Sequence, residues 1–251
     1  IQENGIGGVI FMQGTPSAQA TQTNLYQKLS KVPLLVAMDA EWGLGMRLTG
    51  VRDMPRQLMM GAMKDSTIVY KMASAIADQC RRLGVHIDFA PDADINNNSA
   101  NPVINERSYG EDRANVTAKA FQYMMGLQDG GVMACAKHFA AYGAAVGGRD
   151  YNSVDMSLRQ LHETYLPPFK AALDAGAATF MNSFNDINGI PATGNKYIQR
   201  DILKGQWKFR GFVVSDWGSI GEMINHGYSK DNKEAGMQAV NAGSDMDMES
   251  R

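Results

Sequence analysis

One short segment, Val213-Val214-Ser215-Asp216-Trp217, places a carboxylate and an indole directly after a β-branched apolar run. Such a run is typical of a buried strand, and in a β/α barrel the carboxyl end of a strand forms the floor of the active site. Asp216 is therefore a candidate nucleophile toward a sugar. Alternatively, Asp216 caps a helix that begins near Gly218, because Asp is a preferred N-cap residue.

Other polar side chains follow the other apolar runs of the chain. They are Asp39, Glu41 and Trp42; Asp92, Asp94 and Arg107; Lys137 and His138; Asn182 and Asn185; and Glu249. Carboxylates, amides and cations that converge on one rim suit a ligand covered with hydroxyl groups, each of which donates and accepts hydrogen bonds. Trp42 and Trp217 are candidates for an apolar wall against a sugar ring.

Each of these residues also has a purely structural interpretation. Arg107 could pair with Glu111, His138 could be a buried structural histidine, and Asp94 could cap a loop. The functional interpretation rests on the joint pattern of polar residues at strand ends rather than on any one of them.

The elements that would position these side chains are seven short apolar runs alternating with helical patterns. The runs cover residues 8–11, 34–38, 85–89, 132–136, 178–181, 212–214 and 245–248. Near-continuous apolar runs between helices predict parallel strands buried on both faces. The expected fold class is α/β, a TIM-type (β/α)8 barrel. With seven runs where eight are usual, we expect a barrel that is incomplete or lacks its first βα unit, with unpaired edges.

The helical segments carry readable signals of their own. Val69 to Leu83 gives an apolar stripe of helical period. Ser157 is a predicted helix N-cap, followed three residues later by Gln160. Pro167-Pro168 should break or kink the helix that follows, and residues 197–207 predict a shorter helix.

Composition narrows the classes of function. The chain has 251 residues and a net charge of −2, which gives no electrostatic case for nucleic acid. No apolar run approaches the roughly 20 residues of a membrane-spanning helix. Cys80 and Cys135 lie in apolar segments and are predicted to be buried thiols. We expect no metal and no organic cofactor.

Three motifs together resemble the N-terminal barrel of glycoside hydrolase family 3, across residues 1–251. They are Lys137-His138-Phe139, residues 105–112 (Asn-Glu-Arg-Ser-Tyr-Gly-Glu-Asp) and Ser215-Asp216-Trp217. The resemblance implies that Asp216 is the nucleophile of a retaining mechanism. It also implies that Asp39, Arg107, Lys137 and His138 hold the hydroxyls of the sugar, with Trp217 beside them.

The two halves of the chain resemble different branches of that family. Residues 1 to about 139 are similar to the β-N-acetylhexosaminidase branch, and residues from about 137 onward to the β-glucosidase branch. We therefore expect either a fragment or a chimera with a seam near residues 137–142. The Asp-x-His dyad of the first branch is absent, because Ala140-Ala141-Tyr142 stands in its place.

The resemblance implies hydrolysis of terminal β-D-glycosidic bonds in β-linked glucosides or oligosaccharides. Two alternatives remain: a β-N-acetylhexosaminidase, and an impaired barrel that only binds sugar. The acid/base of the glucosidase branch lies in a C-terminal α/β sandwich domain, expected in a periplasmic or secreted parent protein. Within the chain, Asp150 and Glu249 are the candidates. Lys137 and Arg107 are expected to keep Asp216 ionised.

Overall fold

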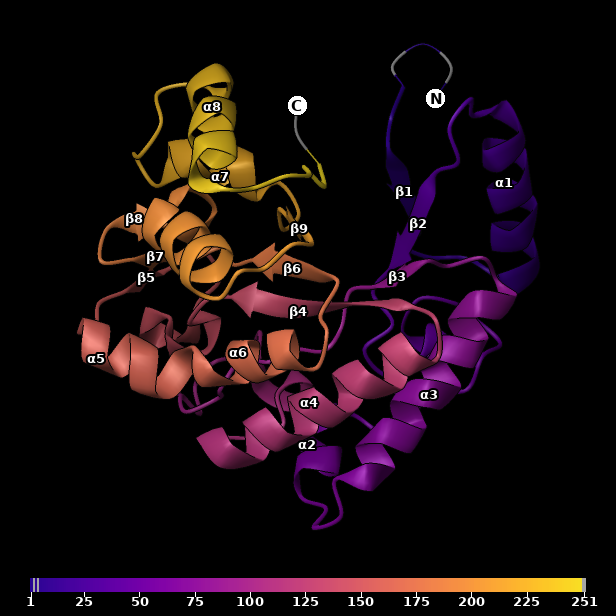
Figure 1. Cartoon of the computed structure of the whole chain (residues 1–251), viewed down its shortest axis with the longest axis horizontal. Helices are drawn as coiled ribbons and strands as arrows, with labels where there is room; N and C mark the ends of the chain where they lie inside the picture. Colours follow the sequence, from indigo (N-terminus) through magenta and orange to yellow (C-terminus); the bar gives the residue numbers. More distant parts are fainter. Residues whose placement is uncertain (2, 4, 250–251) are drawn as a thin grey trace.

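The computed structural model describes residues 1, 3 and 5–249 and contains a curled, all-parallel sheet (Figure 1). The strand order in this sheet is β1-β2-β3-β4-β6-β9. The strands are β1 (Gly8–Ile10), β2 (Leu35–Met38), β3 (Ile87–Asp88), β4 (Met133–Phe139), β6 (Thr179–Asn182) and β9 (Phe212–Val214). Six of the seven apolar runs therefore form strands, and the structure confirms the α/β barrel-type fold with an incomplete barrel.

Helices connect the strands. They are α1 (Pro16–Leu29), α2 (Gln57–Gly61), α3 (Thr67–Arg82), α4 (Arg113–Asp129), α5 (Leu158–Gln160), α6 (Pro167–Asp174), α7 (Ser219–Asn225) and α8 (Asn232–Ala242). Wider π-helical turns cover Leu161–Tyr165 and Tyr197–Gln206. The predicted cap is confirmed, because the Ser157 hydroxyl accepts from the Gln160 N–H. The helix is also interrupted where Pro167 opens α6. In the part of the chain that the structure describes, none of the helices has the length and hydropathy that a membrane crossing requires.

Side chains of each strand alternate between two apolar layers. Val36 and Val213 face the large core under the helices. Ala37 and Val214, one residue further along, face a smaller core on the inner side of the curled sheet. This period-two alternation follows from the pleat of a strand, and it leaves the residues just past each strand tip free to face the carboxyl edge.

The helices α3 and α4 pack closely on the outer face of the sheet. The predicted stripe of α3 is buried from Val69 to Cys80. Gly126 of α4 permits the contact, since a Cβ atom there would lie 2.4 Å from the Tyr70 carbonyl oxygen. The close packing fixes α4, whose Tyr123 reaches beneath the site.

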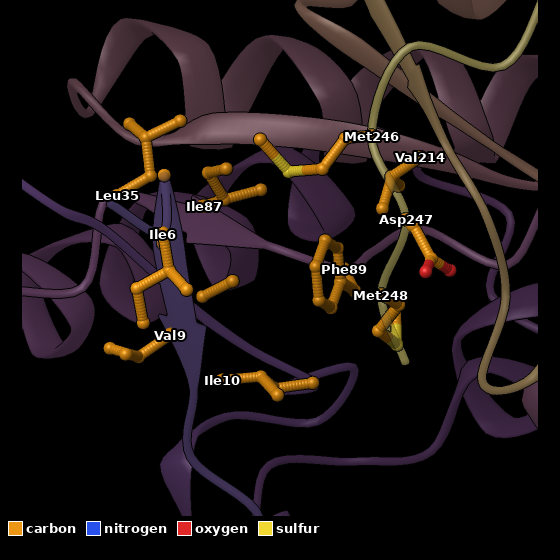
Figure 2. Close-up of a pocket in the computed structure, with 13 residues that line it drawn as sticks. Ile6, Val9, Ile10, Leu35, Ile87, Phe89, Val214, Met246, Asp247 and Met248 are labelled. Carbon is orange, nitrogen blue, oxygen red and sulfur yellow. The ribbon is translucent and has the colours of Figure 1, made fainter. Parts of the chain in front are cut away.

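The seventh run, residues 245–248, was predicted as a strand but makes only one parallel bridge, between Val214 and Met246. No pairing among the described residues joins this segment to β1. Figure 2 shows the resulting cavity, of about 300 Å³, with Val9 and Ile10 on one side and Met246 and Met248 on the other. The sheet is therefore open at the place where a closed barrel would have another strand.

A second, small sheet was not predicted. It joins β5 (Ser153–Val154), β7 (Asp186–Ile187) and β8 (Ile190–Pro191) beyond the carboxyl ends of β4 and β6. Two-residue strands give no periodic pattern in the sequence. Tyr151 lies just before β5 and Phe184 just before β7. Their rings contact each other with centroids 4.6 Å apart, so the small sheet holds these two loops together.

Asp88 is a fully buried carboxyl group on β3 that binds two neighbours. It accepts the Ala40 N–H at 2.9 Å, and the Tyr123 hydroxyl lies 3.4 Å away. Burial is the main cause that raises the pKa of Asp88, to about 7. The folded state therefore binds this proton more tightly than the unfolded chain does.

We predict that the free energy of unfolding falls as pH rises from about 4 to about 8, and that Asp88→Asn removes roughly 3–4 kcal/mol of that fall. The raised pKa sets the sign, because the stabilising proton is fully bound below the unfolded pKa and is lost as pH passes the folded one. Urea unfolding at several pH values measures the free energy of unfolding of the native chain and of each variant. Asp78→Asn, on the exposed side of α3, is the matched control. Equal slopes for Asp88→Asn and the native chain would contradict the prediction.

Candidate functional site

The carboxyl ends of the strands surround a pocket of about 360 Å³. Asp39 follows β2, Lys137 and His138 end β4, and Asp216 comes two residues after β9. Arg107 ends a short 3-10 turn in the loop after β3. All six predicted site residues line this one pocket, and one of them, Trp217, is 45% exposed. The structure thus brings the predicted set together.

Ion pairs that are buried or partly buried connect three of these residues with Arg47 and Glu41 in one chain of alternating charges. Arg47 Nη2 lies 2.5 Å from Asp39, and Asp39 lies 2.7 Å from Lys137 Nζ. Lys137 Nζ is also 2.8 Å from Glu41, which in turn lies 2.8 Å from Arg107 Nη2. We call this series, Arg47–Asp39–Lys137–Glu41–Arg107, the charge chain.

The charge chain favours the ionised forms of Asp39, Glu41 and Lys137. Burial alone would raise the pKa of Asp39, but Lys137 and Arg47 together outweigh it, and the pKa lies below its ordinary value. Arg107 and Lys137 lower the pKa of Glu41 in the same way against its burial. Burial would lower the pKa of Lys137, yet Asp39 and Glu41 raise it. Fixed charges at known places are what a site needs to bind a polar ligand by charge-assisted hydrogen bonds.

His138 is oriented by Asp94. The Asp94 Oδ2 atom accepts the His138 backbone N–H at 2.9 Å. Nδ1 of the His138 ring lies 2.8 Å from the same oxygen. Arg107 Nη2 lies 3.2 Å from the other ring nitrogen, Nε2. Because a guanidinium only donates, Nε2 accepts and Nδ1 carries the proton. His138 Nε2 also lies 3.8 Å from Asp216, so Asp94 fixes the face that the imidazole presents to the pocket.

Three of these side chains, Asp92, Asp94 and His138, lie close enough together to hold a metal ion. Arg107 Nε is 3.8 Å from Asp92, so a cation bound there would meet an existing positive charge. Burial, and then the neighbouring Asp94, raise the pKa of Asp92 well above its ordinary value. Both influences favour the neutral form of Asp92, against the opposing effect of Arg107.

Asp216 sits on the floor of the pocket and is 9% exposed. Its Oδ1 accepts the Trp217 N–H at 2.7 Å, and its own N–H donates to Asn182 Oδ1. Burial raises the pKa of Asp216 above its ordinary value. Lys137 lowers this pKa, as expected, but burial outweighs its effect, and Asp39 raises the pKa further.

The chain matches the model of the glycosyl hydrolase family 3 N-terminal domain over residues 1–251. It belongs to glycoside hydrolase family 3. It is 40% identical to the periplasmic beta-glucosidase of Salmonella typhimurium over 66% of this chain and 22% of that protein. The matched region is thus about a fifth of the length of this relative.

Solved structures of the family have the same fold. The beta-glucosidase from Listeria innocua in complex with isofagomine is 34% identical and superposes with a TM-score of 0.88, covering 96% of this chain and 34% of that one. The family 3 beta-N-acetylglucosaminidase from Paenibacillus sp. str. FPU-7 is 32% identical, with a TM-score of 0.88 over 98% of this chain and 49% of that one. Both branches that the sequence resembles therefore occur among its structural neighbours.

Asp150 also lines the pocket of this family 3 domain, together with Asp39, Glu41 and Asp216. Burial and the charge of Asp216 raise its pKa. Glu249, the other candidate for the acid/base, is not among the residues that line the pocket. The geometry therefore separates two candidates that the sequence left equal.

Several residues behave differently from the sequence expectation. Trp42 does not line the pocket: it is 9% exposed and stacks under Arg56, whose Cζ lies 3.7 Å from its ring centroid. Asn182 and Asn185 are fully buried and do not reach the rim. The Asn182 side-chain oxygen instead accepts the backbone N–H of Asp216. The residue whose importance the sequence did not reveal is Glu41; its only signal was its position two residues after Asp39.

We predict that Asp216→Asn lowers the pKa of Asp150, because it removes the negative charge that helps to raise it. Burial is the larger cause and stays, so the pKa should remain above its ordinary value. A carbon-13 NMR titration of the Asp150 carboxyl group measures this directly. Asp155→Asn, an exposed carboxylate outside the pocket, is the control and should change nothing. An unaltered Asp150 titration in Asp216→Asn would show that the two groups do not interact.

Proposed function

We propose that this domain carries the sugar site and the nucleophile of a retaining β-glycosidase that acts on terminal β-D-glucosides. The observation that carries the proposal is the position of Asp216, in a pocket that is also lined by charged hydrogen-bonding groups and by apolar and aromatic side chains. Its place after β9 is where a barrel enzyme of this type positions catalytic residues. The similarity to a beta-glucosidase supports the choice of sugar.

In the proposed reaction an Asp216 oxygen attacks the anomeric carbon as the bond to the leaving oxygen breaks. The sugar is then held as an ester, and a water molecule hydrolyses it in a second displacement that restores the starting configuration. Asp39, Arg107, Lys137 and His138 bind the sugar hydroxyls, and Trp217 contacts the ring or the leaving group. The raised pKa of Asp216 means that attack weakens as pH falls and the carboxylate takes up a proton.

The leaving oxygen needs a proton from a second carboxyl group. In longer members of the family we expect that proton to come from a C-terminal α/β sandwich domain. Within this chain Asp150 is the candidate that faces the pocket. Loss of general acid help costs about 10²–10⁴-fold in rate. The domain should therefore cleave substrates with good leaving groups far better than ordinary glucosides, and the parent protein is proposed to be periplasmic or secreted.

A β-N-acetylhexosaminidase is the second candidate, favoured by the similarity of the first half of the chain to that branch. The absence of its loop dyad, replaced by Ala140-Ala141-Tyr142, opposes it. Comparing hydrolysis of nitrophenyl β-glucoside with nitrophenyl β-N-acetylglucosaminide decides between the two. Sugar binding without any covalent labelling would identify the third possibility, an impaired barrel.

We predict that a dinitrophenyl 2-deoxy-2-fluoro-β-glucoside labels Asp216 covalently. The first step needs no acid, because dinitrophenolate leaves without a proton, and the fluorine slows hydrolysis of the ester. Peptide mass spectrometry locates the sugar. Asp216→Ala should abolish labelling, whereas the exposed control Asp155→Ala should retain it. A label on any other residue would refute the assignment of the nucleophile.

We predict that Asp39→Ala weakens binding of glucose by about tenfold or more, since a hydrogen bond to a charged group contributes roughly 1.5–3 kcal/mol. Isothermal calorimetry gives the affinity. Asp174→Ala removes a carboxylate that pairs with Lys170 on the surface of α6, and it should leave the affinity unchanged. If Asp39→Ala binds glucose as tightly as the native chain, Asp39 is not part of the site.

A further inference from the structure

Glu41 is a fully buried carboxylate to which the mechanism above gives no task. We propose that it is a positioning residue, which holds Arg107 and Lys137 in the orientation in which they face the sugar. The expected effect of Glu41 on sugar binding rests on the proposed function. The claim that Glu41 orients Arg107 rests only on the contacts between the two side chains.

The contacts of Glu41 use both of its oxygens. Oε1 lies 2.8 Å from Lys137 Nζ and 2.8 Å from Arg107 Nη2. Arg107 Nε donates to Oε2 at 3.1 Å and to Oε1 at 3.2 Å. The planar guanidinium is therefore bound through two of its nitrogens, which fixes its plane as well as its position.

The main chain of Glu41 is itself held from two helices. Gln57 Nε2 of α2 donates to the Glu41 carbonyl oxygen at 2.6 Å, and the Tyr123 hydroxyl of α4 donates to it at 3.1 Å. Both of these side chains are fully buried. A carboxylate on an anchored backbone can transmit the rigidity of the core to the flexible side chains that it binds.

Exposure separates the positioning group from the groups that it positions. The Glu41 side chain is 0% exposed, whereas that of Arg107 is 22% exposed and that of Asp39 is 15% exposed. Glu41 lies in the wall of the pocket, but its side chain is covered, so its effect on a ligand runs mainly through Arg107 and Lys137.

Arg107 also contacts the Val103 carbonyl oxygen and His138, but among the described residues no other carboxylate lies as close to it as Glu41. Asp92 lies 3.8 Å from Arg107 Nε, and burial together with Asp94 favours its neutral form. Lys137 would keep Asp39 as a partner. Loss of Glu41 should thus release Arg107 more than Lys137, and this asymmetry makes Arg107 the residue to monitor.

The first experiment follows Arg107 itself and needs no sugar. Phenylglyoxal modifies accessible guanidinium groups, and peptide mass spectrometry gives the rate at Arg107. Glu41→Gln should raise that rate several-fold. Glu41→Asp, which keeps the charge but shortens the side chain, should raise it less and serves as the variant that preserves the buried charge if Glu41→Gln fails to fold. Asp88→Asn, another fully buried carboxylate bound to Tyr123, is the matched control. An unchanged rate at Arg107 in folded Glu41 variants overturns the proposal.

The second experiment measures glucose affinity by calorimetry. Glu41→Gln should weaken binding by about tenfold, and Asp88→Asn should not. In an Arg107→Ala background the same Glu41 change should weaken binding by less than about threefold, because its effect runs mainly through Arg107. Equal losses in both backgrounds indicate a merely structural role and overturn the proposal. If the native chain binds no glucose while Glu41→Gln still frees Arg107, the proposed function fails and the hold on Arg107 stands.

Discussion

The site depends on one constraint: several charges must be buried together at the carboxyl edge of the sheet, and they are stable only as alternating pairs. Isolated, each of them would be too costly to remove from water. The charge chain meets this constraint with Lys137 between two carboxylates and Glu41 between two cations. Removing Asp39 or Glu41 would leave Arg47 or Arg107 without its carboxylate partner in the charge chain, which explains why residues from distant segments must fold into one cluster.

This pairing has a consequence for the carboxylates outside the charge chain. Because Asp39 and Glu41 bind the available cations closely, Asp92, Asp150 and Asp216 are left with burial as the dominant influence, and all three have raised pKa values. The acid groups that line the pocket are therefore of two kinds. The pKa values of Asp39 and Glu41 are lowered, which favours the ionised form and suits hydroxyl binding, whereas those of Asp150 and Asp216 are raised.

The sheet supports this arrangement although it is open. Parallel pairing from β1 to β9 brings the ends of β2, β4 and β9 to one edge, and α3 and α4 pack on the outer face. The opening lies between β1 and the segment around Met246, at the apolar cavity of Figure 2. The charge chain lies on the side of β2 and β4, where neighbouring strands are paired.

The sequence by itself predicted the strands from their apolar runs, the α3 stripe, the Ser157 cap and the set of polar residues that line the pocket. These signals are local, since each depends on the period or the order of neighbouring residues. It also identified the family from three short motifs, while the proposed seam near residues 137–142 stays a prediction. Only the tertiary structure decided which charges pair. Glu41 meets Arg107 across 66 positions of sequence, and Trp42 turns under Arg56 rather than toward the pocket. The raised pKa of Asp216 was likewise beyond the sequence, because desolvation depends on the three-dimensional packing of the whole edge and not on the residues beside it.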